Sequence, residues 1–289
     1  MNYSRLPWLP GLLLALLAVG CAVNPYAATN RSYKKQARAL SKQLRPLPAA
    51  PDSLPAPAYP VGTTNFNLRK PNYVIIHHTA QTSTAQTLKT FTLPRTQVSA
   101  HYVIGRDGQT VHMLNDYLRA WHGGVARWGS LSDINSVSIG IELDNDGTEP
   151  FQEAQISSLL RLLGQLKKAY QVPVTNFIGH ADIAPTRKND PSTRFPWARL
   201  AARGYGLWYD AAALAADPTA PVPFAPADSL GRPGPGLSPA EALRIIGYDT
   251  RNLPDAIVAF KRHFVQTDLS PGLTEWDRRV LYAIYRQCL

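Results

Sequence analysis

One stretch, SVSIGIELDNDGTEPFQEAQISSLLRLLGQLKKAY (Ser136–Tyr170), shows the alternation that decides the fold class. Its first part, Ser136–Leu143, is a short run rich in aliphatic and β-branched residues, which predicts a buried strand. Residues 151–170 then carry apolar side chains at the three- and four-residue intervals of an amphipathic helix, namely at Ile156, Leu159, Leu160, Leu163 and Leu166. A strand followed directly by a helix is typical of a sheet with helices packed on it.

Similar segments lie on both sides of this stretch. Four further strands are expected, at Tyr73–His77, His101–Ile104, Thr110–Leu114 and Val174–Ile178. Residues 84–93 are expected to form another helix, and the turn Arg106–Gln109 contains an Asp-Gly pair, which is a hairpin signal. The sequence therefore predicts an α/β domain with a central mixed β-sheet flanked by helices.

Two proline-rich segments divide the chain, and such composition is typical of extended linkers. We expect a signal peptide at 1–20, a lipidated, basic, proline-rich tether at 21–60, the α/β domain at 61–216, a Pro/Gly-rich linker at 217–237 and a helical domain at 238–289. The last part is expected to be a small all-α, three-helix bundle with its own core. Its helices are expected near residues 239–247, 254–266 and 274–287. Because it shows no cluster of His, Asp and Glu, binding rather than chemistry is expected there.

The N-terminus has the features of an export signal. Arg5 precedes an apolar run, Leu12–Val19, that is too short to cross a bilayer. The sequence LAVGC before and including Cys21 resembles a bacterial lipobox, so Cys21 is expected to carry the lipid that anchors the protein. Ala22 after the cysteine then favours the outer membrane, with the protein facing the periplasm. The alternative is a plain secretory signal with an incidental cysteine.

Charge and cysteine content exclude several classes of protein. The net charge is +10, and residues 22–50 contribute six Lys and Arg and no acid. This segment, with a basic helix expected at about 33–44, either faces an anionic surface such as lipid head groups or is a solvated spacer. Nucleic acid is not an expected partner, because the charge is local and the chain carries an export signal. The two cysteines, Cys21 and Cys288, exclude a disulfide scaffold and a four-cysteine zinc site, but not zinc bound by His and carboxylate.

Histidines and carboxylates gather near the ends of predicted strands. His77 and His78 end one strand, and only one of them can face a given cleft because adjacent strand residues point to opposite sides. His180 and Asp190 lie on a predicted loop, Ile178–Pro191, that follows another strand. Two imidazoles and a carboxylate suit Zn²⁺, although this spacing alone is weak evidence. Glu142, near the end of an apolar strand, is either a salt-bridged structural residue or a general base whose pKa burial raises.

Five motifs in this order, IIHHTA, SAHYVIGRDG, AWHGG, SIGIELDN and GHADIAPTRKNDP, resemble those of the zinc-dependent N-acetylmuramoyl-L-alanine amidases of the second amidase family. The resemblance covers about residues 70–200. With the lipobox and the C-terminal helices, the chain is most similar to an outer-membrane lipoprotein subgroup of that family. Residues 238–289 resemble a peptidoglycan-binding domain.

The resemblance implies one zinc ion bound by His77, His180 and Asp190, with Glu142 and Lys188 as catalytic residues. Glu142 matches the family's general base, and Lys188 matches the cation that stabilises the transition state. Two further polar residues, His122 and Asp182, match positions that we interpret as structural or cleft-lining. Three aromatic residues belong either to a glycan cleft or to the core, namely Tyr102, Trp121 and Trp128.

The implied reaction is hydrolysis of the amide between N-acetylmuramic acid and L-alanine in peptidoglycan, during turnover or recycling of the cell wall. The expected partners of this monomer are peptidoglycan and muropeptides, and the membrane through Cys21. Two alternatives stay open, a non-catalytic peptidoglycan-recognition protein of the same fold and a zinc peptidase that cuts the stem peptide. Such non-catalytic relatives usually lack a metal ligand, so the presence of Asp190 argues against the first.

Overall fold

The computed structural model describes residues 24–45, 68, 70–216, 224 and 236–289. It divides the chain into two compact units, residues 1–66 and residues 67–289. The expected signal peptide, the lipidation site Cys21, residues 46–60 of the tether and most of the linker at 217–237 lie outside the described residues. Within the described ranges, no helix is both long and apolar enough to cross a membrane.

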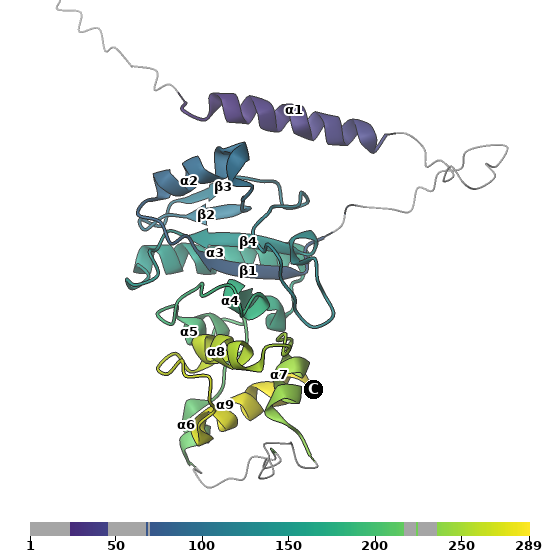
Figure 1. Ribbon diagram of the computed structural model, residues 1–289. Coiled ribbons are helices and arrows are strands. Elements are labelled where there is room, and N and C mark those ends of the chain that lie inside the picture. The colour runs from purple at the N-terminus through teal and green to yellow at the C-terminus, as the bar shows by residue number, and fades with distance from the viewer. Residues whose placement is uncertain (1–23, 46–67, 69, 217–223, 225–235) are drawn as a thin grey trace, which may run out of the picture. The chain divides into compact units, whose positions relative to one another are not determined.

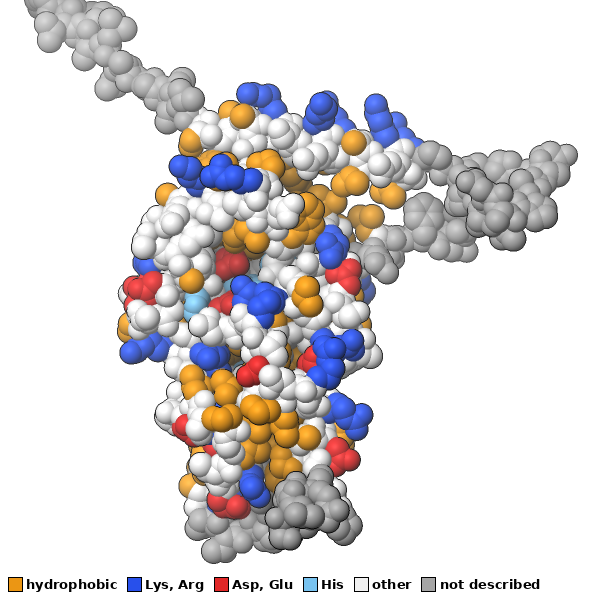
Figure 2. Space-filling view, viewed as in Figure 1, with side chains coloured by type: hydrophobic (Ala, Val, Ile, Leu, Met, Phe, Trp, Pro, Cys, Tyr) orange, Lys and Arg blue, Asp and Glu red, His pale blue; other side chains and the backbone are white. Residues whose placement is uncertain are grey.

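The described part of the first unit is a single helix, α1 (Ala27–Gln43), which begins earlier than expected. Its side chains are all exposed or half-buried. At 100° per residue, the five cations from Arg31 to Lys42 fall on one face and Tyr33 and Leu40 on the opposite one. Lys and Arg side chains are visible along this helix in Figure 2. The helix is therefore both basic and amphipathic.

The second unit is built on a five-stranded sheet with the strand order β3-β2-β4-β1-β5. The strands are β1 (Tyr73–His78), β2 (Tyr102–Ile104), β3 (Thr110–His112), β4 (Ser138–Leu143) and β5 (Phe177–Gly179). Strand β1 pairs in parallel with β4 and β5, β2 pairs in parallel with β4, and β3 is antiparallel to β2. The predicted mixed sheet is thus confirmed.

Helices flank this sheet, as predicted (Figure 1). Helix α3 (Glu153–Tyr170) buries its leucine stripe in one cluster with side chains of β1, β2 and β4. Helix α2 (Thr84–Thr92) contacts β2. Every residue of β4 is buried, yet its sequence alternates. Ile139, Ile141 and Leu143 pack in the cluster with α3, so Ser138, Gly140 and Glu142 lie on the opposite face of the sheet.

Two local expectations are wrong. Residues Val174–Asn176 form a 3-10 turn, so β5 is limited to Phe177–Gly179. The segment expected as a loop contains a short helix, α4 (His180–Ile183). The side chain of Asp182 accepts a hydrogen bond from the Gly179 N–H at 2.7 Å and so satisfies a donor at the helix start. Three such short helices, α4, α5 (Trp197–Ala201) and α6 (Ala211–Ala216), are too brief to give a periodic signal.

The C-terminal helices lie close to their predicted ranges, at α7 (Pro239–Ile246), α8 (Leu253–Phe264) and α9 (Glu275–Tyr285). Each begins after a residue whose side chain accepts a backbone N–H of the first turn, Ser238, Asn252 and Thr274 respectively. The structure differs from the expected separate core, because one buried cluster contains side chains of these helices together with Ile75, Trp128 and Ile178. The helices are therefore packed onto the sheet domain.

Lys261 of α8 is a fully buried cation. Its ion pairs and hydrogen bonds are expected to stabilise the packing of the C-terminal helices. Its ammonium lies 3.0 Å from Asp277, donates to Ser270 Oγ at 3.1 Å and to the Gly272 carbonyl at 2.9 Å, and bonds Asp268. We expect Lys261→Met to lower the free energy of unfolding by about 3–5 kcal/mol, because it leaves the buried Asp277 carboxylate without its cation. Urea unfolding measures this change.

The matched control is Arg199→Met, which breaks the ion pair between Arg199 and Glu153 at the surface. Exposed ion pairs contribute little to the free energy of unfolding, so Arg199→Met should lower it far less than Lys261→Met does. Equal stability of Lys261→Met and the unmodified protein would show that this network does not stabilise the fold.

Candidate metal centre

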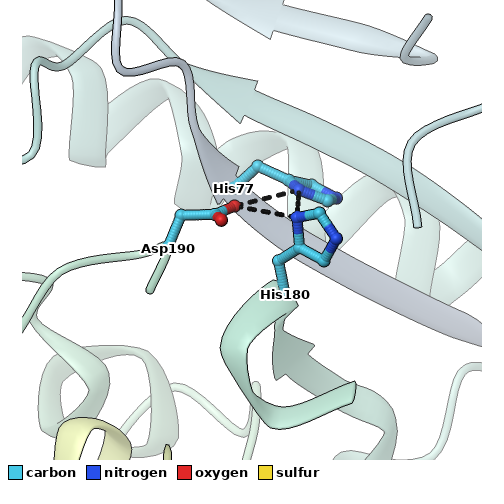
Figure 3. Close-up of side chains that lie close together, drawn as sticks. All are labelled: His77, His180 and Asp190. Atoms are coloured by element: carbon cyan, nitrogen blue, oxygen red, sulfur yellow. Dashed lines mark hydrogen bonds and ion pairs between the residues drawn. The ribbon is translucent and has the colours of Figure 1, made fainter. Parts of the chain in front are cut away.

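Three side chains that the sequence marked as ligands meet at one edge of the sheet (Figure 3). His77 lies near the end of β1, His180 opens α4 directly after β5, and Asp190 lies on the loop that follows α4. Because β1 and β5 are parallel neighbours, their ends bring the two histidines together. The Nδ1 atoms of His77 and His180 are 2.8 Å apart, and each is 3.1 Å from Asp190 Oδ2. All three residues are buried.

The hydrogen-bond partner of His180 Nε2 determines which ring nitrogen of His180 carries the proton. His180 Nε2 lies 3.1 Å from the Gly123 carbonyl oxygen, which can only accept a hydrogen bond. The proton of a neutral His180 ring is therefore on Nε2, and Nδ1 presents a lone pair to the cluster. The amide oxygen of Asn135 holds this segment, since it accepts the backbone N–H groups of His122 and Gly123.

A chain of hydrogen bonds shows in the same way which ring nitrogen of His77 carries the proton. The Ser138 hydroxyl donates to the Ile134 carbonyl at 2.6 Å, so it accepts a hydrogen bond from His122 Nε2 at 3.1 Å. His122 Nδ1 is then free to accept from His77 Nε2, also at 3.1 Å. Burial lowers the pKa of His122 well below its ordinary value, so the ring is neutral as this chain requires. The structure thus places His122 behind His77, where it orients the ring.

The three atoms that converge are all hydrogen-bond acceptors, two imidazole lone pairs and one carboxylate oxygen. Acceptors that face one another repel unless a cation lies between them. Zinc with nitrogen ligands at about 2.0–2.1 Å in a tetrahedron separates its ligand atoms by about 3.3 Å. The separations here, 2.8 and 3.1 Å, are slightly shorter. The arrangement therefore fits one small divalent cation, and within the described residues it is the one group of this kind.

The protonation states also suit a cation. Burial, reinforced by the charge of His180, lowers the pKa of His77 to about 4. Burial alone would raise the pKa of Asp190, but contacts with His180 and His77 outweigh it and hold the pKa below its usual range. At neutral pH the cluster thus offers a neutral His77 and an ionised carboxylate, the forms that bind metals.

Glu142 lies beside this cluster because it pairs with His77 across the parallel strands β4 and β1. Its Oε1 is 4.0 Å from His77 Nδ1, and its Oε2 is buried with no hydrogen-bond partner among the described residues. Burial, and then the charge of Asp190, raise its pKa to about 8, while Lys188 opposes the rise. Among the described residues, its ion-pair contact is with His77, whose ring is neutral at pH 7, so a salt-bridged structural role is not supported.

The remaining candidates fall into three groups. Lys188 is half-buried, and its positive charge acts on both His77 and Glu142. His78 points away from the cluster, where its Nδ1 accepts the Ser192 N–H at 3.2 Å, so only one residue of the pair faces the site. Tyr102 and Trp128 are buried core residues, whereas Trp121 is 52% exposed.

Sequence reasoning missed two residues that hold the histidines in place. Ser138 contacts the ring of His122, and Asn135 accepts the backbone N–H groups of His122 and Gly123. Ser138 is a polar residue in an apolar strand, which was a usable signal; Asn135 carried none. It also missed the reason for Gly140 on β4. A Cβ at Gly140 would lie 2.4 Å from His122 Cγ, so only glycine leaves room for that ring.

We therefore expect Gly140→Ala to displace His122 from His77. The expected result is a loss of metal affinity of about ten- to a hundredfold, the usual effect of removing a partner behind a ligand. Overpacking should also lower the free energy of unfolding by about 1–3 kcal/mol. Zinc titration against a competing chelator and urea unfolding measure the two effects. Gly272→Ala is the control, because nothing lies within 4 Å of its added Cβ; unchanged affinity in Gly140→Ala would contradict the assigned role of His122.

Known proteins match this chain over the same region. A family model described as N-acetylmuramoyl-L-alanine amidase matches residues 67–193. The N-acetylmuramoyl-L-alanine amidase AmiD of Escherichia coli K12 is 33% identical over 218 residues, which are 67% of this chain and 75% of that protein.

Solved structures extend the similarity. The complex of E. coli AmiD with the substrate anhydro-N-acetylmuramic acid-L-Ala-D-gamma-Glu-L-Lys has a TM-score of 0.65 at 27% identity and covers 80% of this chain and 95% of that one. AmpDh3 from Pseudomonas aeruginosa, in complex with anhydromuramic pentapeptide, has a TM-score of 0.61 at 27% identity. The match covers 82% of this chain and 98% of that one. The predicted fold is thus shared with both of these solved structures.

Proposed function

Because the chain belongs to the N-acetylmuramoyl-L-alanine amidase family, we propose that it hydrolyses, with one zinc ion, the amide between N-acetylmuramic acid and L-alanine in peptidoglycan. The observation that carries the proposal is the convergence of three acceptor atoms, from His77, His180 and Asp190, beside the buried carboxylate of Glu142, whose Oε2 lacks a hydrogen-bond partner among the described residues. The two solved relatives hold anhydro-muropeptides, which supports muropeptides as the substrate class here.

In this proposal His77, His180 and Asp190 hold the zinc ion. Bound zinc supplies a Lewis acid that polarises the carbonyl and makes water nucleophilic at neutral pH. The hydrogen bonds from His77 to His122 and from His180 to the Gly123 carbonyl keep both lone pairs directed at the ion. Asp190 contributes the negative charge that offsets part of the charge of the ion.

Glu142 is the proposed proton carrier. Attack of water on the carbonyl releases a proton. The carboxyl group of Glu142 lies beside the cluster to accept it, and its Oε2 has no hydrogen-bond partner among the described residues. Positive charge held by the cluster would lower the Glu142 pKa from about 8 toward neutrality, the range in which a carboxyl group both takes and returns a proton. Glu142 then delivers the proton to the L-alanine nitrogen as the C–N bond breaks.

Lys188 is the proposed stabiliser of the developing oxyanion. Its positive charge acts on the pKa of both Glu142 and His77, which supports this role. One donor of this kind typically contributes about 3 kcal/mol to transition-state stabilisation.

Digestion of purified sacculi and of a synthetic anhydro-muropeptide, followed by mass analysis of the products, tests the proposal. The expected products are intact stem peptides that begin with L-alanine. A chelator should abolish their release, and one equivalent of zinc should restore it. Cleavage inside the stem peptide would instead identify a zinc peptidase, and binding without cleavage would identify a recognition protein.

We further propose that Cys21 is lipidated and anchors a monomer to the outer membrane, facing the periplasm. The lipobox-like sequence supports the anchor, and the cations of α1 suit anionic head groups nearby. Cys21→Ser should move the protein from the membrane fraction to the soluble fraction. Mass analysis of the mature N-terminus would show the acyl groups directly, and an unmodified Cys21 would contradict the proposal.

A further inference from the structure

The C-terminal helices meet the sheet domain close to the metal centre. In Figure 1, α8 lies next to α4 and α5, and the residues of α8 and α4 are in contact. The Trp197 ring stacks on His263 of α8 with 3.8 Å between ring centroids. Gln266 just after α8 donates to the Phe195 carbonyl at 2.8 Å. The contact between the two parts is therefore ordered by aromatic stacking and by specific hydrogen bonds.

One carboxylate links α4 to these helices. Asp182, two residues after the ligand His180, is 2% exposed and accepts three hydrogen bonds. Its Oδ1 accepts the Tyr248 hydroxyl at 2.7 Å, and its Oδ2 accepts His263 Nδ1 and the Gly179 N–H, each at 2.7 Å. Tyr248 and His263 are themselves buried. Two of the three donors thus come from the chain after the linker at 217–237.

These hydrogen bonds bear directly on the position of His180. A buried carboxylate is stable only when its oxygens are satisfied, so Asp182 depends on Tyr248 and His263. Asp182 in turn holds the Gly179 N–H at the start of α4, the point from which His180 projects. Metal coordination is sensitive to shifts of about 0.2 Å. If Asp182 no longer held the Gly179 N–H, His180 would shift and the site would bind the ion less tightly.

A neighbouring cation adds to this arrangement. Arg262 precedes His263 on α8 and is half-buried. Burial lowers the pKa of Arg262, and the carboxylates of Asp182 and Asp190 both act against that shift. Helix α8 therefore brings one positive charge within electrostatic reach of both the anchoring carboxylate and a metal ligand.

We propose that Tyr248 and His263 are positioning residues of the metal centre, which act through Asp182 on His180. The C-terminal helices are then an integral part of the zinc site, whatever else they bind. This inference rests on the proposed zinc site and assigns to these helices a role that the expected peptidoglycan-binding domain did not include.

Zinc affinity of the full chain, measured by competition with a chromophoric chelator, tests this role without recourse to activity. Tyr248→Phe and His263→Leu remove one donor each and should weaken zinc binding about tenfold or more. His263→Asn keeps an N–H close to the position of Nδ1 while it loses the ring that stacks on Trp197. It should retain affinity within about threefold, because only the donor matters in this proposal.

Two controls match these variants. Tyr282→Phe removes a hydroxyl from α9 that contacts Arg286 rather than α4. Gln266→Leu removes a hydrogen bond between the same two parts of the molecule that does not involve Asp182. Both should bind zinc like the unmodified protein. Thermal unfolding followed by circular dichroism identifies any variant that fails to fold, and Tyr248→Phe and His263→Leu provide separate tests.

The outcomes are distinct. Unchanged affinity in both Tyr248→Phe and His263→Leu, with tight binding by the unmodified protein, overturns the positioning role alone. If His263→Leu and His263→Asn lose the same zinc affinity, the His263–Asp182 hydrogen bond does not position His180. The same conclusion follows if the two controls lose as much zinc affinity as Tyr248→Phe and His263→Leu. An unmodified protein that binds no zinc overturns the proposed function, and the positioning role with it.

Discussion

Replacing His180 by alanine is expected to abolish stoichiometric zinc binding and to lower amide cleavage by about three orders of magnitude or more. The variant removes one of three converging ligand atoms, and His77 and Asp190 alone leave an incomplete site. Loss of the Lewis acid removes several kcal/mol of transition-state stabilisation, and each 1.4 kcal/mol is about tenfold in rate. Elemental analysis of the purified protein and turnover on an anhydro-muropeptide measure the two effects.

His112→Ala is the control for this experiment. His112 lies on β3 with half of its side chain exposed, and it contacts Asp116 rather than the cluster. It should keep full metal content and turnover. Full zinc content in His180→Ala would remove His180 from the metal centre and refute the assignment.

Glu142→Gln is expected to keep zinc and to lose most turnover, by about 10²- to 10⁴-fold, the usual contribution of a positioned general base. Glutamine has the shape of the carboxyl group but cannot take a proton from water. The variant should be at least as stable as the unmodified protein, because the Oε2 of Glu142 is buried without a partner among the described residues and burial raises its pKa to about 8. Zinc content, steady-state kinetics and urea unfolding together measure this result.

Glu153→Gln is the matched control, since Glu153 lies at the start of α3 and pairs with Arg199 at the surface. Its turnover should not change. If Glu142→Gln retained near-normal turnover, another group would have to carry the proton. A parallel loss of zinc in Glu142→Gln would instead show that Glu142 acts on the metal and not on the proton.

Much of the architecture was accessible from local sequence patterns. Strand β4 and helix α3 were predicted because aliphatic and β-branched residues are concentrated in the strand and leucines recur at helical spacing in the helix. The short helix α4 was missed, because four residues give no period and its start depends on the Asp182 side chain. The expected separate core of the C-terminal helices was wrong, since apolar spacing shows which face is buried but not what it is buried against.

Residue type and strand periodicity are local properties, so the sequence alone predicted two imidazoles at strand ends, a carboxylate on a loop that follows a strand, and a glutamate on a largely apolar strand. The orientation and proton positions of the rings depend on the tertiary fold. His122 is set by Ser138 and the Ile134 carbonyl, and Asp182 is held by Tyr248 and His263, far along the chain. Such contacts are made by folding, so no local pattern records them.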